Sequence, residues 1–188
     1  ADSVVVGQFV GKDALAAVGT SGAVVNIVTF FIVGICLGAS VLMSEFYGAG
    51  KKEKFQKEIA TSLWAGLLFT AAAAGAGFFA VPQILAFMRT PAQVMDTAIE
   101  YLRIIFLGLP FCFLYNLLAS ALRSVGDSKT PLLFLAGSSI LNIGLDLLLV
   151  GAFSMGTGGA AWATIFSQMV SALFCWVIFT KRRLCCGP

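Results

Sequence analysis

The sequence lacks histidine altogether and has few charged residues. Charged side chains make up 11% of its 188 residues, whereas a soluble domain has about 25%. Without histidine, a metal site built on imidazole is excluded, and proton transfer has to use carboxyl groups. The sequence also shows no nucleophile motif and no cluster of metal ligands, so we expect a protein that is not an enzyme. Cys36, Cys112 and Cys175 lie within apolar runs and predict packing residues, not a disulfide framework.

Apolar segments long enough to cross a membrane are what the sequence has in excess. Hydrophobic residues make up 59% of the chain, and the mean hydropathy is +0.95. A helix needs about 20 mostly apolar residues to span the hydrocarbon core of a bilayer. We predict five such spans, at residues 21–43, 59–87, 101–122, 131–153 and 159–180.

The predicted fold class is all-α, a polytopic membrane protein. The apolar stretch 1–10 is about half as long as a span, and we interpret it as the end of a first helix whose beginning is missing. Residues 1–183 would then form a six-helix transmembrane bundle, followed by a cytoplasmic tail at residues 184–188.

The distribution of basic residues predicts the orientation of the helices. Nine of the twelve Lys and Arg residues lie in two connections, 47–58 and 123–130, or at the end of the sixth helix. The alternate connections carry only Lys12 and Arg89. Because cytoplasmic loops are enriched in basic residues, we expect both ends on the cytoplasmic side of a plasma or bacterial inner membrane. The net charge of only +3 gives no reason to expect a nucleic-acid partner.

Asp146 is an acidic residue inside the apolar segment 131–153. Placing a carboxylate there costs roughly 2.5–3.5 kcal/mol on membrane-insertion scales. Asn142 precedes it by one turn and Ser138 by two, with Ser139 alongside, so the spacing puts this polar stripe on one helix face. Such a stripe must face the protein interior or a watery cavity, and an acid in a membrane helix indicates a functional site. The alternative is a carboxylate that only holds two helices together.

A carboxyl group with no Lys or Arg in its own span can bind a proton, Na⁺ or a cationic substrate in turn. An amide oxygen one turn away, from Asn142, suits a small hard cation. Two other polar residues are weaker candidates on their own. Thr164 in the sixth helix would ordinarily bond to its own turn, and Asp2 lies either within the first helix or in solvent.

Two motifs predict structure and not chemistry. Gly34 and Gly38 form a G-x-x-x-G pattern, which favours close packing against another membrane helix. Gly126 and Asp127 predict a turn and an N-cap that lead into the fifth helix, with Arg123 as an anchor at the membrane interface.

Five stretches of the chain together resemble the multidrug and toxic compound extrusion (MATE) family. They cover nearly the whole sequence in the order and spacing of the N-terminal half of such a transporter. The resemblance implies twelve helices in two six-helix lobes with a cavity between them, and therefore a second lobe in the full-length chain. The stretches are DSVVVGQFVGKDALAAVG, SEFYGAGKKE, YLRIIFLGLPFCFLYNLLASALRSVGDSKTP, LNIGLDLLLVGAF and GTGGAAWAT.

The resemblance also implies a function, the export of cationic drugs by alternating access, coupled to H⁺ or Na⁺ and without a cofactor. The family's cation site consists of an acid in the first helix, Asn and Asp in the fifth, and Thr in the sixth. These fall on Asp2, Asn142, Asp146 and Thr164, and Na⁺ would bind at the first three. Because the second lobe is absent, we expect this chain alone not to form the central substrate cavity.

Two alternatives stay open. A flippase for lipids or lipid-linked oligosaccharides, from the same superfamily, would share these helices but carry fixed basic residues in its cavity, and we expect none within the predicted spans. A non-transporting membrane scaffold would have no reason to keep Asp146, and a silent Asp146→Leu substitution would favour it.

Overall fold

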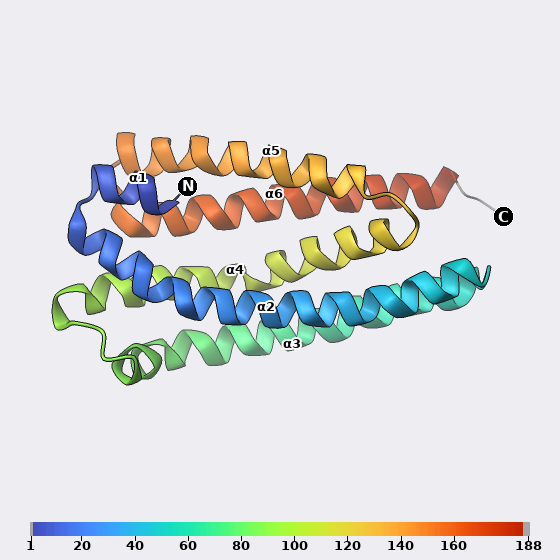
Figure 1. The fold of residues 1–188 in the computed structure, drawn as a ribbon, viewed down its shortest axis with the longest axis horizontal. Coiled ribbons are helices and arrows are strands. Elements are labelled where there is room, and N and C mark those ends of the chain that lie inside the picture. Colours follow the sequence, from blue (N-terminus) through green and yellow to red (C-terminus); the bar gives the residue numbers. More distant parts are fainter. Residues whose placement is uncertain (1, 186–188) are drawn as a thin grey trace.

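Within residues 2–185, six α-helices follow the apolar segments of the sequence in order (Figure 1). The structure is a computed structural model, which describes the backbone of these residues and all their side chains except those of residues 2, 13 and 182–185. The fifth helix continues directly into a π-helix, η1. The elements are α1 (Asp2–Phe9), α2 (Lys12–Gly48), α3 (Lys52–Phe87), α4 (Ala92–Ser124), α5 (Lys129–Asp146), η1 (Leu147–Ala152) and α6 (Gly156–Cys185).

Five of these helical segments are long and apolar enough to cross a membrane, which confirms the predicted fold class. α1, with eight residues, falls short of a span. α2 and α4 begin well before the predicted spans 21–43 and 101–122. α6 runs to Cys185 and so includes the start of the predicted tail, whose last residues, 186–188, lie outside the described part of the chain.

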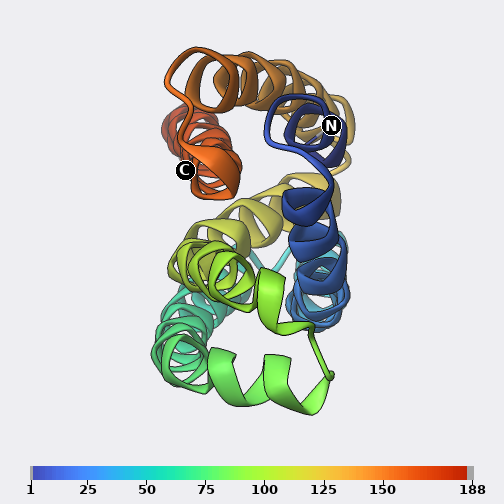
Figure 2. The ribbon, with the colours of Figure 1, turned by 90° about the vertical axis from the view of Figure 1, so that its left-hand side faces the viewer.

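α4 is the central helix of the bundle. It packs against α2, α3 and α6, and buried residues make up 61% of its most apolar window, compared with 17% in α2 and 11% in α5. Seen along the bundle, α5 and α6 lie on one side of α4, with α2 and α3 on the other (Figure 2). α1 lies beside the end of α5 and contacts α2, η1 and α6.

The connection between α4 and α5 confirms the predicted turn. Gly126 has a φ of 87°, a left-handed conformation that favours glycine. Its N–H donates to the Arg123 carbonyl (3.0 Å), and the Asp127 N–H donates to the Leu122 carbonyl (3.0 Å), which together form a Schellman C-cap. The Asp127 Oδ1 then accepts the Thr130 N–H (3.1 Å) and caps the first turn of α5.

Within the described residues, no other helix packs closely against Gly34 or Gly38, and close packing at this motif stays a prediction. Both glycines are exposed, and no described atom lies within 4 Å of a Cβ placed on either one. Close approaches occur instead at Gly66 and Gly77 of α3, because aromatic rings of α4 occupy the space that a Cβ would fill. A G-x-x-x-G pattern marks a face that can pack closely, whereas the arrangement of the bundle decides whether a helix meets it.

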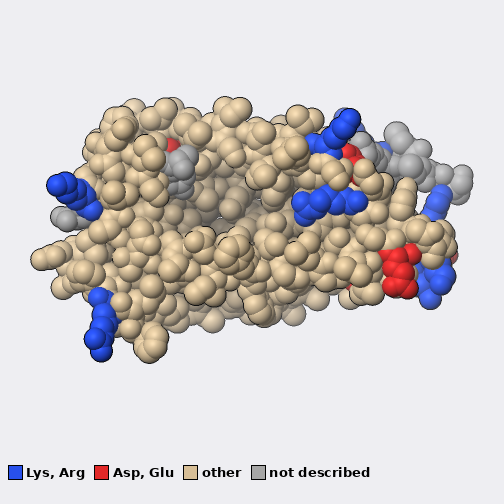
Figure 3. All heavy atoms as spheres, in the orientation of Figure 1, with Lys and Arg blue, Asp and Glu red and all other residues tan. Residues whose placement is uncertain are grey.

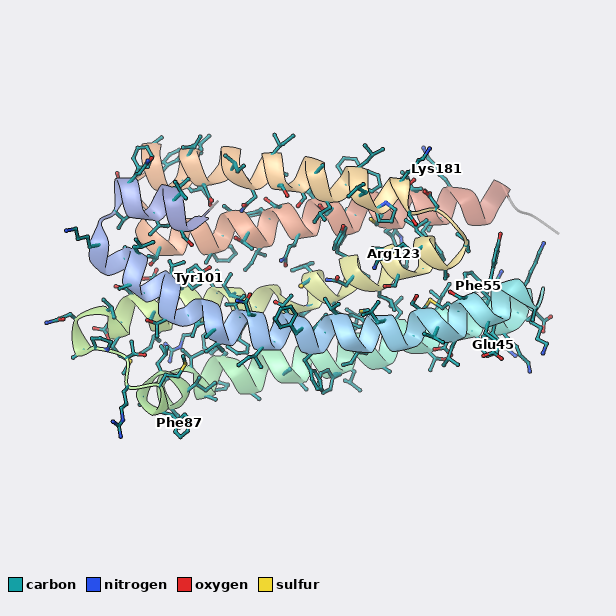
Figure 4. The ribbon with its side chains drawn as sticks, in the orientation of Figure 1. Glu45, Phe55, Phe87, Tyr101, Arg123 and Lys181 are labelled. Atoms are coloured by element: carbon teal, nitrogen blue, oxygen red, sulfur yellow. The ribbon has the colours of Figure 1, made fainter. Side chains whose placement is uncertain are left out.

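Basic side chains gather at one end of the bundle, where the α2–α3 and α4–α5 connections lie (Figure 3). Arg123 and Lys181 are at this end and Phe87 at the opposite one (Figure 4). The Arg123 Nη2 donates to the Ser120 Oγ (3.0 Å). This charge distribution is the one the sequence predicts, and the side of the membrane that it faces remains a prediction.

Candidate functional site

Asp146 is completely buried, with an exposed fraction of 0%, on a helix that is otherwise mostly exposed. Within α5, the buried residues are Asp146 and Pro131. The acid lies at the end of α5, where α1, η1 and α6 come together. Its burial places this residue of the polar stripe in the protein interior.

Asn142, one turn before Asp146, joins α5 to α6. Its Nδ2 donates to the Thr164 Oγ1 across the two helices (3.4 Å), and the Thr164 hydroxyl donates to the Ala160 carbonyl one turn earlier (3.0 Å). Ser138 makes a second link between the helices, with its Oγ donating to the Ser167 carbonyl (3.2 Å). Three of the four residues that the family resemblance selects are therefore gathered where α5 meets α6.

The fourth, Asp2, is the first residue of α1, and its side chain lies outside the described part of the structure. The helix that carries it is nevertheless close to Asp146. Its last residue, Phe9, lies against Gly151 of η1, since a Cβ placed on Gly151 would be 3.6 Å from the Phe9 Cε1. The backbone therefore brings α1 beside the end of α5, as the site requires.

The helix widens immediately after Asp146. In η1, the Phe153 N–H donates to the Leu148 carbonyl five residues back (3.0 Å). π-helical turns of this kind are often found at functional sites. The start of α6 packs tightly against this turn because Gly159 lacks a side chain, and a Cβ there would lie 3.3 Å from the Leu149 carbonyl carbon. This close approach places Thr164, one turn and a half along α6, opposite Asn142.

A cavity of about 280 Å³ opens beside Asn142, between α2, α4, α5 and α6. Figure 3 shows the molecule hollowed between α5 and α2. The side chains that line this cavity are all uncharged, and many are amides or hydroxyls. They are Thr29, Cys112, Tyr115, Asn116, Leu135, Ser138, Ser139, Asn142, Thr164, Ser167, Gln168 and Ser171.

Two polar residues of this cavity and one charged residue of α4 are not among the candidates predicted from the sequence. Asn116 and Gln168 are polar side chains within apolar spans, and the criterion that selected Asp146 could have selected them too. Arg103 is a basic residue inside α4. It is absent from the cavity lining, and its guanidinium contacts Phe78 of α3. The expectation that the predicted spans contain no basic residue is therefore wrong at Arg103, although no basic residue is among the described lining of this cavity.

Chemically, the site offers a buried carboxylate one turn from an amide and a hydroxyl. Oxygen ligands of this kind suit a proton or a hard cation such as Na⁺. Among the described residues, no group of three Cys, Asp or Glu side chains is placed to hold a metal ion. A Na⁺ site would thus depend on the amide and hydroxyl oxygens of Asn142 and Thr164 as well as on the carboxylate.

Comparison with known proteins identifies the family. The MatE family model matches residues 1–148. The chain is 35% identical over 182 residues to the probable multidrug resistance protein YoeA of Bacillus subtilis (strain 168), and 34% identical over 186 residues to YpnP of the same organism. These matches cover 95% and 97% of this chain but 39% and 41% of the relatives, so the chain spans about two fifths of their length.

Solved structures agree with the sequence match. A crystal structure of MATE in the bent conformation superposes with a TM-score of 0.91 at 28% identity, covering 96% of this chain and 40% of that one. A structure of a MATE transporter in the outward-facing conformation gives a TM-score of 0.87 at 29% identity, over 96% of this chain and 40% of that one. This chain therefore belongs to the MatE family of multidrug and toxic compound extrusion transporters, and its extent is consistent with their N-terminal half.

Proposed function

We propose that this chain is the N-terminal lobe of an exporter of organic cations, driven by the entry of H⁺ or Na⁺. The observation that carries the proposal is the complete burial of Asp146 one turn from the Asn142–Thr164 bond, beside a cavity lined by uncharged polar groups. The names of the relatives, probable multidrug resistance proteins, support export of this kind.

If the coupling ion and the cationic substrate bind in turn to one carboxylate, the entry of the ion is coupled to the export of the substrate. The cavity lining is uncharged, and the single acid of α5 is Asp146, one turn beyond the lining residue Asn142. We therefore take Asp146 as the carboxylate that attracts a cation from the cavity. A proton or Na⁺ bound to Asp146, with help from Asn142 and Asp2, would neutralise it and weaken the attraction for a cationic substrate. Ion and substrate would then exclude one another, as antiport requires.

The ion would also shift the conformation of the lobe. α1 touches η1 through Phe9 and Gly151, directly after the acid. Neutralising Asp146 removes the need to solvate a charge at this junction, so it favours a different packing of α1 on α5. An ion can shift such an equilibrium only as far as its affinity differs between the two states. Alternating access between lobes is then a rigid-body movement around the site.

A second six-helix lobe and an orientation in the membrane complete the proposal. The chain covers about 40% of its relatives, so we propose that the rest of the full-length protein supplies the other wall of the central cavity. We place the end with Arg123 and Lys181 in the cytoplasm, because basic residues are enriched there. No cofactor other than the coupling ion enters the mechanism.

The function is tested with the full-length protein in proteoliposomes loaded with ethidium, a fluorescent organic cation. An inward-directed H⁺ or Na⁺ gradient should accelerate the export of ethidium about tenfold or more, and the gradient that succeeds identifies the coupling ion. Export at the rate of protein-free vesicles under both gradients, from a protein shown to be folded, would refute the proposal.

Thr164→Val should raise the half-saturating concentration of the coupling ion about three- to tenfold. Valine keeps the shape of threonine but removes the hydroxyl that accepts the Asn142 amide. A hydrogen bond between membrane helices contributes about 0.6–1.7 kcal/mol, and 1.4 kcal/mol corresponds to a factor of ten. The measurement is the initial rate of ethidium export against ion concentration.

Thr180→Val is the matched control on the same helix. The Thr180 hydroxyl donates only within its own turns, to the Trp176 and Val177 carbonyls. Its loss should leave the half-saturating concentration unchanged. An equal effect of both substitutions would mean that Thr164 acts through helix stability and not through the ion site.

A further inference from the structure

Pro82 interrupts the hydrogen bonding of α3. It lies inside this helix, and proline has no N–H to donate. In an α-helix, the donor at position 82 would bond to the carbonyl four residues earlier, which belongs to Phe78. The backbone of α3 therefore leaves the Phe78 carbonyl without its usual partner. A carbonyl in that state costs several kcal/mol in a membrane, where water cannot replace the missing donor.

Arg103 of α4 supplies the missing donor from outside the helix. Its Nε donates to the Phe78 carbonyl oxygen (3.4 Å), and its Cζ lies 5.0 Å from the centre of the Phe78 ring. One residue thus receives both contacts of the guanidinium, a hydrogen bond to its carbonyl and a cation–π contact with its ring. A positive charge within a membrane helix needs such partners, so the carbonyl and the charge satisfy one another.

The neighbouring contacts show that Arg103 and Phe78 lie in the closely packed interface between α3 and α4. The Phe106 ring, one turn after Arg103, fills the space where Gly77 would carry a Cβ, next to Phe78. Glu100, one turn before Arg103, lies instead against the start of α6, where a Cβ on Gly158 would be 2.8 Å from its Oε1. Although Glu100 lies one turn away on the same helix, the Arg103 side chain contacts Phe78 of α3.

We propose that Arg103 is a positioning residue that replaces the backbone donor missing at Pro82 and holds the interrupted turn of α3 against α4. α4 also packs on α6, which carries Thr164. The interface between α3 and α4 therefore fixes the part of α3 beyond Pro82 relative to α5 and α6, the two helices that carry the ion site. The effect on transport rests on the proposed function, whereas the effect on α3 does not.

A double-mutant cycle in the full-length protein tests the pairing of Arg103 with Pro82. Arg103→Ala should lower the Tm by about 5 °C, because a hydrogen bond from a charged donor is lost. It should also speed amide exchange in residues 79–87 about tenfold. Pro82→Ala restores an N–H for the Phe78 carbonyl. In that background, Arg103→Ala should lower the Tm by only about 1 °C and leave exchange in this segment unchanged.

An equal Tm loss from Arg103→Ala with and without Pro82 would overturn the proposal, because a general packing role does not depend on the proline. Arg103→Lys keeps a charged donor but not the planar guanidinium, and it should lose about half as much. Arg103→Lys replaces Arg103→Ala in the cycle if the alanine variant does not yield folded protein. An unaltered Tm of Arg103→Lys, together with unaltered amide exchange in residues 79–87, would count against the proposal.

Ethidium export by the same proteins separates this proposal from the proposed function. Arg103→Ala should slow export about three- to tenfold with an unchanged half-saturating ion concentration, and the double variant should match Pro82→Ala alone. If no protein exports ethidium but the Tm and exchange cycle shows coupling, the proposed function fails and the pairing stands. If wild type exports ethidium and the cycle is additive, the pairing fails.

Discussion

Asp146→Asn should reduce coupled export by about a hundredfold or more while the protein stays folded. Asparagine has nearly the shape of aspartate, so it fits the fully buried position, but it can neither carry a charge nor take up a proton. Losing a buried charge interaction costs about 2–5 kcal/mol, and each 1.4 kcal/mol is a factor of ten. The measurement is gradient-driven ethidium export from proteoliposomes, with the Tm of the purified protein as evidence of folding.

Asp96→Asn is the matched control for the loss of a carboxylate. Asp96 is an exposed residue of α4, far in sequence from the site, and its substitution should leave export within about twofold of wild type. Wild-type export by Asp146→Asn at equal expression would show that the carboxylate has no part in coupling. An equally silent Asp146→Leu would favour a membrane scaffold.

The existence of the helices could be predicted from the sequence because hydrophobic length alone demands them. Their ends could not. α4 begins at Ala92, before the predicted start at residue 101, since Asp96 and Glu100 hide its first turns from a hydropathy criterion. Hydropathy reports which residues meet the hydrocarbon core, whereas a helix continues for as long as its backbone hydrogen bonds do.

The polar stripe of α5 could be predicted for a similar reason, since the helical repeat fixes which residues share a face. Ser138 and Asn142 do face α6, and Asp146 is buried. Thr164 is only a weak candidate from the residues alone, and the family resemblance is what selects it. Its distance from Asn142 depends on how closely α6 approaches η1 at Gly159, and no periodicity within one helix contains that information.

The close approaches between α3 and α4 occur at glycines that lie outside the G-x-x-x-G motif. The G-x-x-x-G motif contains Gly34 and Gly38, which are exposed in the described chain, whereas Gly66 belongs to no such motif. From the sequence alone, Gly66 would be expected only to lower the helix propensity of α3. Its importance comes from α4, whose Phe113 ring lies directly against it. A contact between two helices is a property of the pair, and a pattern in one of them predicts it poorly.

Gly66→Ala should destabilise the protein by about 3 kcal/mol and lower its Tm and its yield. A Cβ on Gly66 would overlap the Phe113 ring, which is 1% exposed and therefore has no room to withdraw. Overpacking costs about 1–3 kcal/mol, and expelling a buried ring costs about 3–5 kcal/mol. The measurement is the Tm of the full-length protein, together with the yield of monodisperse material.

Gly75→Ala on the same helix separates this clash from the general effect of replacing glycine. Gly75 is exposed, and no described atom lies within 4 Å of a Cβ placed there. Alanine favours the helix over glycine by up to about 1 kcal/mol, so the Tm should stay the same or rise.

Phe113→Leu removes the ring atoms that a Cβ on Gly66 would overlap. The double variant should therefore lose less stability than the sum of the two single losses, by at least ~0.5 kcal/mol, the lower limit for coupled neighbours. Strictly additive stability losses would mean that the Phe113 ring does not obstruct a side chain at Gly66, and that the interface between α3 and α4 tolerates one there.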